Sequence, residues 1–208
     1  MDIRQAYNIW SNAYDTNNNK TRDLEAISLR ATLKNIQFDS CLEIGCGTGK
    51  NTEWLLTKAN QITAVDLSEE MLAMAVEKIR SEKVIFHQAD ITKKWGFAIK
   101  QYDLVIFSLV LEHIEDLDDI FRQAAKSTAQ NGYVYIGELH PYKQYAGSKA
   151  RFQTASGQQV LTCFNHNVSD FAQSAKQNGF SIVDINEYFD DDDRNNIPRI
   201  LTLLLRKQ

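Results

Sequence analysis

Residues 42–52 read LEIGCGTGKNT, an apolar segment that runs into a glycine-rich turn and a polar helix start. Gly45, Gly47 and Gly49 permit positive φ and leave no Cβ to keep a ligand away from the backbone. An isolated acid, Asp66, ends the next apolar segment 21 residues after Gly45. This pattern is typical of a parallel sheet that binds an adenosine-bearing cofactor at the carboxyl ends of its strands, with the acid on the ribose hydroxyls.

The glycine spacing separates the classes of cofactor-binding loop. A dinucleotide fingerprint reads G-x-G-x-x-G, whereas the third glycine of this chain comes one residue early. A P-loop reads G-x-x-x-x-G-K-[ST], but this chain has Ile44 at the first glycine position and Asn51 at the Ser/Thr position. The spacing therefore argues against both a dinucleotide and a nucleoside triphosphate.

The form E-x-G-C-G-x-G resembles motif I of the class I S-adenosylmethionine-dependent methyltransferases. Further segments resemble later motifs of that family, in the family's order, and they are AVDLS at 64–68, HQADI at 87–91, YDLVIFS at 102–108 and GYVYI at 132–136. The resemblance covers roughly residues 38–139 by motif and 167–206 by pattern. It implies S-adenosyl-L-methionine as the cofactor and a small molecule as the methyl acceptor.

The resemblance also assigns roles at the cofactor site. Asp66 would bind the ribose hydroxyls and Asp90 the adenine amino group. Glu43 lies inside a strand, where an unpaired charge is costly, so we expect it near the cationic methionyl end. Tyr14, or Tyr7 on the same N-terminal helix, would cover that end. The predicted cofactor-binding residues are Glu43, Gly45, Cys46, Gly47, Gly49, Asp66, Leu67, Met71, Asp90, Ile91, Ser108 and Tyr14.

Two histidines are candidates for contact with the acceptor. His140 follows the fifth predicted strand, and His166 opens the segment before the sixth in a pattern found among small-molecule methyltransferases. We predict His140 and His166 as catalytic bases for a hydroxyl acceptor, with local hydrogen bonding as the alternative. Glu112 and His113 follow the fourth strand, where the resembled family often carries such a pair in a structural role.

Alternating apolar and polar segments predict one doubly wound, Rossmann-like α/β domain. We expect a seven-stranded, mostly parallel sheet with an antiparallel last strand and helices on both faces. The expected strands are 40–45, 61–66, 83–88, 102–108, 131–138, 180–188 and 199–206. The expected helices are 3–14, 21–35, 50–59, 68–81, 116–129 and 168–178.

Within that domain we distinguish four segments: an N-terminal helical cap at 1–37, a cofactor-binding core at 38–139, an acceptor lid at 140–166, and a C-terminal helix with closing strands at 167–208. Residues 152–164 are expected to form a hairpin about Ser156–Gly157. Between Glu138 and Asp170 the chain has no acid, yet it carries Lys143, Lys149 and Arg151. Such a lid would attract an anionic acceptor, although chance in a surface loop is a competing explanation.

Composition limits the remaining possibilities. A net charge of −4 and a pI of 5.6 argue against general binding of nucleic acid or anionic membranes. Three cysteines without metal-ligand spacing fit a reducing, cytoplasmic compartment and predict no metal site. No apolar run is long enough for a membrane span, and the N-terminus does not resemble a signal peptide. We expect a monomer or a homodimer.

The sequence thus predicts methyl transfer from S-adenosyl-L-methionine to a small molecule, with an anionic acceptor as the finer expectation. A non-catalytic sensor or partner subunit that binds the same cofactor is the alternative. The acceptor atom, and the need for a general base, do not follow from the sequence.

Overall fold

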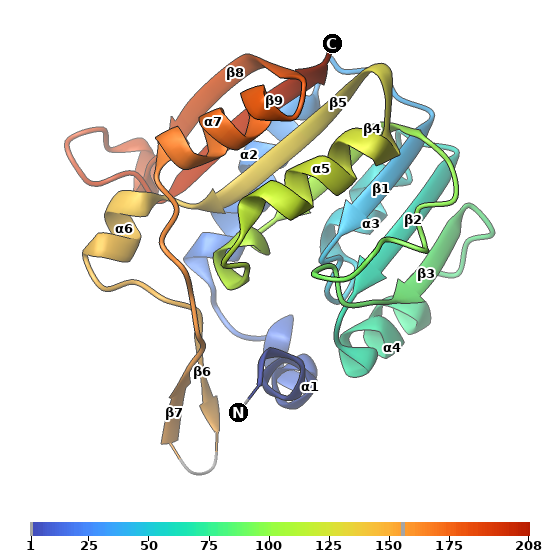
Figure 1. The fold of residues 1–208 in the computed structure, drawn as a ribbon. Helices are drawn as coiled ribbons and strands as arrows, with labels where there is room; N and C mark the ends of the chain where they lie inside the picture. The colour runs from blue at the N-terminus through green and yellow to red at the C-terminus, as the bar shows by residue number, and fades with distance from the viewer. Residues whose placement is uncertain (1, 155–156) are drawn as a thin grey trace.

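A seven-stranded sheet forms the middle layer of the protein, with helices on both of its faces (Figure 1). The computed structural model describes residues 2–154 and 157–208. The strands lie in the order β3-β2-β1-β4-β5-β9-β8. They are β1 Ser40–Ile44, β2 Gln61–Asp66, β3 Val84–Gln88, β4 Tyr102–Ser108, β5 Thr128–Leu139, β8 Phe180–Tyr188 and β9 Ile200–Lys207.

The direction of the strands confirms the predicted sheet. β1 pairs in parallel with both β2 and β4, while β9 runs antiparallel to its neighbours β5 and β8. The chain first builds outward from β1 to β3 and then returns to place β4 on the other side of β1. This reversal opens a crevice at the carboxyl ends of β1 and β4, where sheets of this type bind ligands.

The helices begin where polar caps satisfy their first backbone N–H groups. Ser68 accepts a hydrogen bond from the Met71 amide, and Asn167 and Asp170 form a capping box. Within the described ranges, no helix is both long and apolar enough to cross a bilayer. The helices are α1 Ile3–Tyr14, α2 Lys20–Leu33, α3 Lys50–Leu55, α4 Glu69–Lys78, α5 Leu117–Ser127, α6 Pro141–Tyr145 and α7 Val168–Gln177, with 3₁₀ turns η1 Leu111–His113 and η2 Asp190–Asp192.

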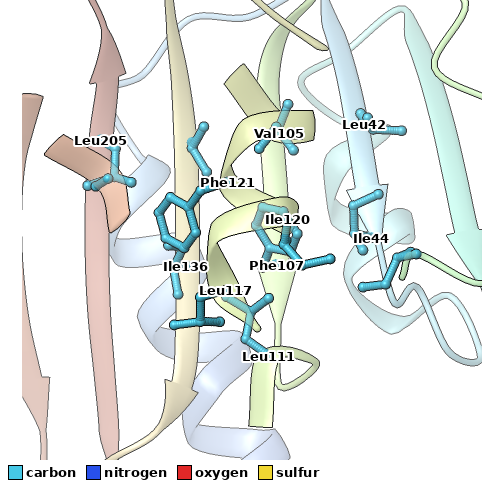
Figure 2. Packing of buried hydrophobic residues seen from close by; sticks show 14 of the residues in the cluster. Leu42, Ile44, Val105, Phe107, Leu111, Leu117, Ile120, Phe121, Ile136 and Leu205 are labelled. Atoms are coloured by element: carbon cyan, nitrogen blue, oxygen red, sulfur yellow. The ribbon is translucent and has the colours of Figure 1, made fainter. Parts of the chain in front are cut away.

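The apolar core lies in two layers, one on each face of the sheet. Alternate side chains of β1 enter opposite layers, because Leu42 and Ile44 join one cluster and Cys41 the other. Figure 2 shows the first cluster, in which Phe107 of β4 and Phe121 of α5 are buried. Full burial of each such side chain contributes about 1.5–3 kcal/mol, so this packing holds the strand ends in place beneath the crevice.

Several predicted boundaries were wrong. The helix after the glycine turn ends at Leu55 and not at 59. β5 begins at Thr128 and not at 131, because the strand pairs with Tyr102 and then continues past Asn131, which takes a positive φ of 63°. The segment 140–166 also contains α6, which was not predicted. Its hairpin consists of β6 Arg151–Thr154 and β7 Gly157–Val160, and the predicted turn residue Ser156 lies outside the described residues.

α1 lies across the carboxyl ends of the strands, close to the β6–β7 hairpin (Figure 1). Polar contacts fasten it to the core. The Ser68 hydroxyl donates to Asn8 Oδ1 at 2.6 Å, and the Thr48 hydroxyl donates to Asp15 Oδ1 at 2.7 Å. Lys78 Nζ lies 2.6 Å from Asp15 Oδ2. These contacts hold the helix as a cover over the glycine turn.

Candidate functional site

The glycine turn has the backbone conformation that its sequence predicts. Gly45, Gly47 and Gly49 have φ values of 73°, 53° and 80°. A Cβ on Gly45 would lie 2.9 Å from Val110 Cγ2, so the chain approaches the β4 exit too closely for any side chain. The amides of Gly45 and Cys46 both donate to the Val65 carbonyl, at 2.7 and 3.0 Å. The turn is therefore held against the end of β2.

Asp66 is fixed by two backbone donors at the end of β2. Its Oδ2 accepts from the Gly47 amide at 2.8 Å, and its Oδ1 accepts from the Ser68 amide at 2.9 Å. Burial raises the pKa of this carboxyl, while the two backbone bonds act in the opposite direction. A carboxylate oxygen has more than one lone pair, so each oxygen can still accept from a ligand hydroxyl.

A cavity of about 550 Å³ opens at the carboxyl ends of β1, β2 and β4, beneath α1. Its volume is that of a site for a small organic ligand. Nine of the twelve predicted cofactor-binding residues line it, namely Gly45, Gly47, Asp66, Leu67, Met71, Asp90, Ile91, Ser108 and Tyr14. The structure thus brings together residues from α1, the glycine turn and the segments that follow β2, β3 and β4.

The other three predicted residues lie elsewhere. Glu43 and Cys46 line a small adjoining cavity of about 40 Å³, which shares Gly45 and Gly47 with the larger one. Gly49 lines neither cavity but begins α3 in a left-handed conformation. Its φ of 80° favours glycine, and a Cβ there would also displace Ile79 Cδ1, 2.7 Å away.

Charged side chains of both signs line the small cavity, namely the acids Glu25 and Glu43 and the bases Arg22 and Lys50. Glu43 is buried, and its Oε2 accepts from the Thr52 hydroxyl at 2.6 Å. Burial, with smaller contributions from the nearby Glu25 and Asp66, raises the pKa of Glu43 to about 8. A positively charged group placed directly against Glu43 would favour the ionised form of this carboxyl.

Asp90 lies at the far end of the cavity, after β3. Its Oδ1 accepts from both the amide and the hydroxyl of Thr92, at 2.9 and 2.6 Å. Thr92 itself lines the cavity beside Asp90. This local turn fixes the carboxyl through Oδ1, so Oδ2 can accept from a ligand amine.

The exit of β4 forms another wall of the cavity. Leu109 takes a positive φ of 54°, a strained conformation for a side chain of this kind. Glu138 of β5 holds the turn, since its Oε1 accepts from the amides of Val110 and Leu111 at 3.0 and 2.8 Å. Burial raises the pKa of Glu138 to about 8. The strained turn places Leu109 and Val110 in the lining of the ligand space.

Tyr7 and His113 join α1 to the β4 exit. The Tyr7 hydroxyl lies 2.8 Å from His113 Nε2, and His113 Nδ1 lies 3.1 Å from the Thr162 carbonyl oxygen. A carbonyl oxygen only accepts, so Nδ1 carries the proton and Nε2 accepts from Tyr7. Both residues line the main cavity. The hydrogen bond therefore closes the cavity beneath α1.

A second cavity, of about 260 Å³, lies on the other side of this contact. It shares Tyr7, Tyr14 and Leu109 with the main cavity and is otherwise lined by parts of α2, the β5 end and the lid segment. We call it the lid cavity. Its charged lining residues are Lys20, Glu112, Lys149, Arg151 and Arg199. The three shared residues separate it from the cavity that the predicted cofactor residues line, which is a suitable position for a methyl acceptor.

The structure does not bring the two predicted catalytic histidines to either cavity. His140 caps α6, and its Nε2 lies 2.9 Å from Glu187 Oε1. His166 is buried with its Nε2 2.7 Å from the Ile114 carbonyl oxygen, to which it donates. Each imidazole is thus used in a local contact, and neither lines the main or the lid cavity. The catalytic role of His140 and His166 gains no support from this arrangement.

One predicted lid cation also lies elsewhere. Lys143 Nζ is 3.6 Å from Asp190 Oδ2, and Lys143 does not line the lid cavity, whereas Lys149 and Arg151 do. Asp190 is also bound by Arg199, whose Nη2 donates to Oδ2 at 2.6 Å. The grouping of Lys143 with the other two cations was therefore wrong, because Lys143 contacts Asp190 and does not line the lid cavity.

Ten residues of the main cavity were not among the predicted cofactor residues. Five of them lie on α1 or follow directly after a predicted residue, and one of these, Tyr7, was the predicted alternative to Tyr14. The ten residues are Asp2, Ile3, Arg4, Tyr7, Ala89, Thr92, Leu109, Val110, His113 and Ile114.

Known proteins share this sequence core and this fold. The family model described as a methyltransferase domain matches residues 42–136. An uncharacterised methyltransferase of Emericella nidulans is 27% identical, over 89% of this chain and 78% of the relative. A ubiquinone biosynthesis O-methyltransferase of Hydrogenovibrio crunogenus is 30% identical over 54% of this chain, which covers only 48% of that relative. The crystal structure of the N-methyltransferase NodS from Bradyrhizobium japonicum, in complex with S-adenosyl-L-homocysteine, has a TM-score of 0.73 at 16% identity, over 100% of this chain and 99% of NodS.

Residues 42–136 are therefore similar to the methyltransferase domain of this family model. The family match and the shared fold confirm the resemblance to the class I S-adenosylmethionine-dependent methyltransferases that the glycine turn and Asp66 predicted.

Proposed function

We propose that this protein transfers a methyl group from S-adenosyl-L-methionine to a small molecule that carries an anionic group. The observation that carries the proposal is the main cavity, which gathers Gly45, Gly47, Asp66 and Asp90 at the carboxyl edge of the sheet. It is joined through Tyr7 to a second cavity with a cationic rim. One cavity suits the cofactor and the other suits the acceptor.

The residues of the main cavity fit the cofactor. Asp66 offers fixed carboxylate oxygens to the ribose hydroxyls, and Asp90 offers its second oxygen to the adenine amine. Gly47 has no described atom within 4 Å of the position that a Cβ would take, so its backbone is open to a ligand. Glu43, whose pKa burial raises to about 8, lies beside the glycine turn, where a bound cationic methionyl end would favour its ionised form. S-adenosyl-L-methionine, when bound, supplies a methyl group on a positively charged sulfur.

The protein's own contribution is then position and exclusion of water. α1 covers the cavity through Tyr7 and Tyr14, and the strained turn at Leu109 forms the wall between the two cavities. Holding the acceptor and donor atoms in line accelerates a displacement without a strong base. Closing the site against water prevents loss of the activated methyl group.

A thermal-shift and calorimetry experiment tests the cofactor assignment. S-adenosyl-L-homocysteine should raise the melting temperature, while NAD and ATP at equal concentration should not, because a ligand that binds the native state stabilises it by mass action. Stabilisation by NAD or ATP alone would contradict the assignment.

A second measurement distinguishes an enzyme from a sensor. Purified protein is incubated with S-adenosyl-L-methionine labelled in the methyl group and with pools of small carboxylates and phosphates. Time-dependent transfer of label that requires an intact Asp66 supports the enzyme. Tight cofactor binding without transfer to any pool favours a protein that only binds the cofactor.

A further inference from the structure

We infer that Glu112 recognises the methyl acceptor, and that this acceptor is a small zwitterion whose ammonium group faces Glu112 while its anionic group faces Lys149 and Arg151. The inference deepens the proposed function and rests on it, because it concerns the lid cavity as the acceptor site. It is carried by the placement of one buried acid and several exposed cations around the same space.

Glu112 is a buried acid that lacks a full set of partners. Only 7% of the residue is exposed, and its Oε2 has no hydrogen-bond partner among the residues that the structure describes. Its Oε1 lies 4.0 Å from Nε2 of His113, which is already bonded to Tyr7. The Cys163 thiol lies against the same carboxyl. A buried, unsatisfied carboxyl is costly, so a donor from a ligand would be strongly favoured.

Hydrogen bonds fix the backbone around Glu112, where the C-terminal end of the lid segment contacts the core. The Phe164 amide donates to the Glu112 carbonyl at 2.7 Å, and Glu138 holds the preceding turn through the amides of Val110 and Leu111. The carboxyl is thus fixed in the wall of the lid cavity by bonds that do not involve the carboxyl itself. The Glu112 carboxyl can therefore bind a ligand without breaking the hydrogen bonds that hold the turn.

The rim of the lid cavity has the opposite charge. Lys20, Lys149 and Arg151 are exposed, and none of them forms an ion pair within residues 2–154 and 157–208. Arg199 also lines the cavity, but it is paired with Asp190. The lid cavity therefore has one buried acid, Glu112, in its wall and exposed cations at its edge. This charge distribution matches that of a molecule with a positive group at one end and a negative group at the other.

Matched pairs of small molecules test the ammonium contact. The probes are 2-aminoethyl phosphate with ethyl phosphate, and β-alanine with propionate, so that each pair differs by the amine. Each is titrated by NMR into protein saturated with S-adenosyl-L-homocysteine, up to about 10 mM, which detects affinities weaker than millimolar. The two anions separate a phosphate-bearing from a carboxylate-bearing acceptor. At least one amine should bind more tightly than its partner without the amine.

Glu112→Gln provides the decisive variant, because it keeps the size of the side chain and removes its charge. The amine probe should lose about 10- to 100-fold in affinity, and the probe without the amine should bind as it does to the unchanged protein. Glu115→Gln, at an exposed position of the same loop, is the matched control and should change neither affinity. Lys149→Gln with Arg151→Gln should weaken both members of a pair.

Three results would overturn the inference: no amine probe binds, the amine adds nothing to affinity, or Glu112→Gln leaves the amine probe unaffected. The last result would mean that Glu112 instead shares a proton with Glu138, whose Oε2 also lacks a partner in the described part of the chain. Binding of S-adenosyl-L-homocysteine is recorded separately. Failure of that binding overturns the proposed function, whereas intact cofactor binding without amine selectivity overturns this inference alone.

Discussion

The Asp66 carboxylate accepts a hydrogen bond from the Gly47 amide at 2.8 Å, so the acid at the end of β2 fixes the glycine turn at the end of β1. The same carboxylate accepts from the Ser68 amide at the start of α4. One side chain therefore positions the turn and presents itself to the cavity. Its roles in the fold and in ligand binding are coupled.

Asp66→Ala should weaken binding of S-adenosyl-L-homocysteine by about 1.5–3 kcal/mol, the range for hydrogen bonds to a charged group. Because two backbone donors also lose their acceptor, the variant should unfold at a lower temperature as well. Calorimetry and thermal melts separate the two effects. Asp90→Ala is the comparison and should be milder, since the Asp90 carboxyl holds a local turn with Thr92 rather than the glycine turn. Unchanged affinity in a folded Asp66 variant would contradict the ribose role.

Gly45→Ala should destabilise the protein through two additive causes. Its φ of 73° costs a side chain about 1–2 kcal/mol, and the new Cβ would lie 2.9 Å from Val110 Cγ2. Gly179→Ala is the matched control, because its φ of 79° is similar and no described atom lies within 4 Å of the position that its Cβ would take. Urea unfolding should give a larger loss for Gly45→Ala. Equal losses would mean that the contact with Val110 does not matter.

The glycine turn and Asp66 were predictable because they lie within one strand–helix–strand unit, where spacing along the chain determines spacing in the fold. The pairing of strands followed from the same alternation of apolar segments. His140 and His166 were chosen by their place along the chain alone. Their partners, Glu187 and the Ile114 carbonyl, lie 47 and 52 residues away, so the orientation of each imidazole depends on the packing of distant elements.

The lid cavity was only partly predictable for the same reason. The acid-free stretch pointed to Lys149 and Arg151, but Glu112 was expected to have a structural role. The contact of Tyr7 with His113 spans 106 residues, and nothing in the local sequence of either residue indicates it. Long-range contacts of this kind decide which side chains surround the acceptor, while local patterns decide the cofactor turn.

Tyr7→Phe tests whether this contact holds α1 over the site. Loss of the hydroxyl leaves His113 Nε2 without its donor, at a cost of about 0.5–1.5 kcal/mol. We expect faster hydrogen exchange in residues 3–14 and weaker binding of S-adenosyl-L-homocysteine. Tyr142→Phe, at a side chain that is 61% exposed, is the control. If α1 exchanges equally in both variants, the helix is held by its other contacts.

The buried Glu43 should make stability depend on pH. Burial raises its pKa from 4.5 to about 8, so the folded state binds this proton more tightly than the unfolded state does. The contribution is complete below pH 4.5 and is lost as pH rises through about 8. The free energy of unfolding, measured with urea, should therefore fall as the pH rises from 4.5 to about 8.

Glu43→Gln should reduce the slope of the free energy of unfolding against pH by at most about 1.4 kcal/mol per pH unit, the limit for one titrating group. Glu115→Gln, at an exposed position, controls for the loss of one negative charge. Glu138 has a similarly raised pKa and remains in both proteins, so some slope should persist. A slope that Glu43→Gln does not alter would show that this carboxyl is ionised in the folded protein.

The last prediction concerns the cations of the lid cavity. Once an acceptor is identified, Lys149→Gln with Arg151→Gln should raise KM for an anionic acceptor on the order of 10-fold at low salt, because the local potential that concentrates the acceptor is lost. The unchanged protein should lose the same advantage as salt rises, since the screening length falls to about 10 Å at 0.1 M. Lys143→Gln is the matched control, because that cation pairs with Asp190 and does not line the lid cavity. An equal rise in KM for Lys143→Gln would mean that overall charge, and not the cavity rim, attracts the acceptor.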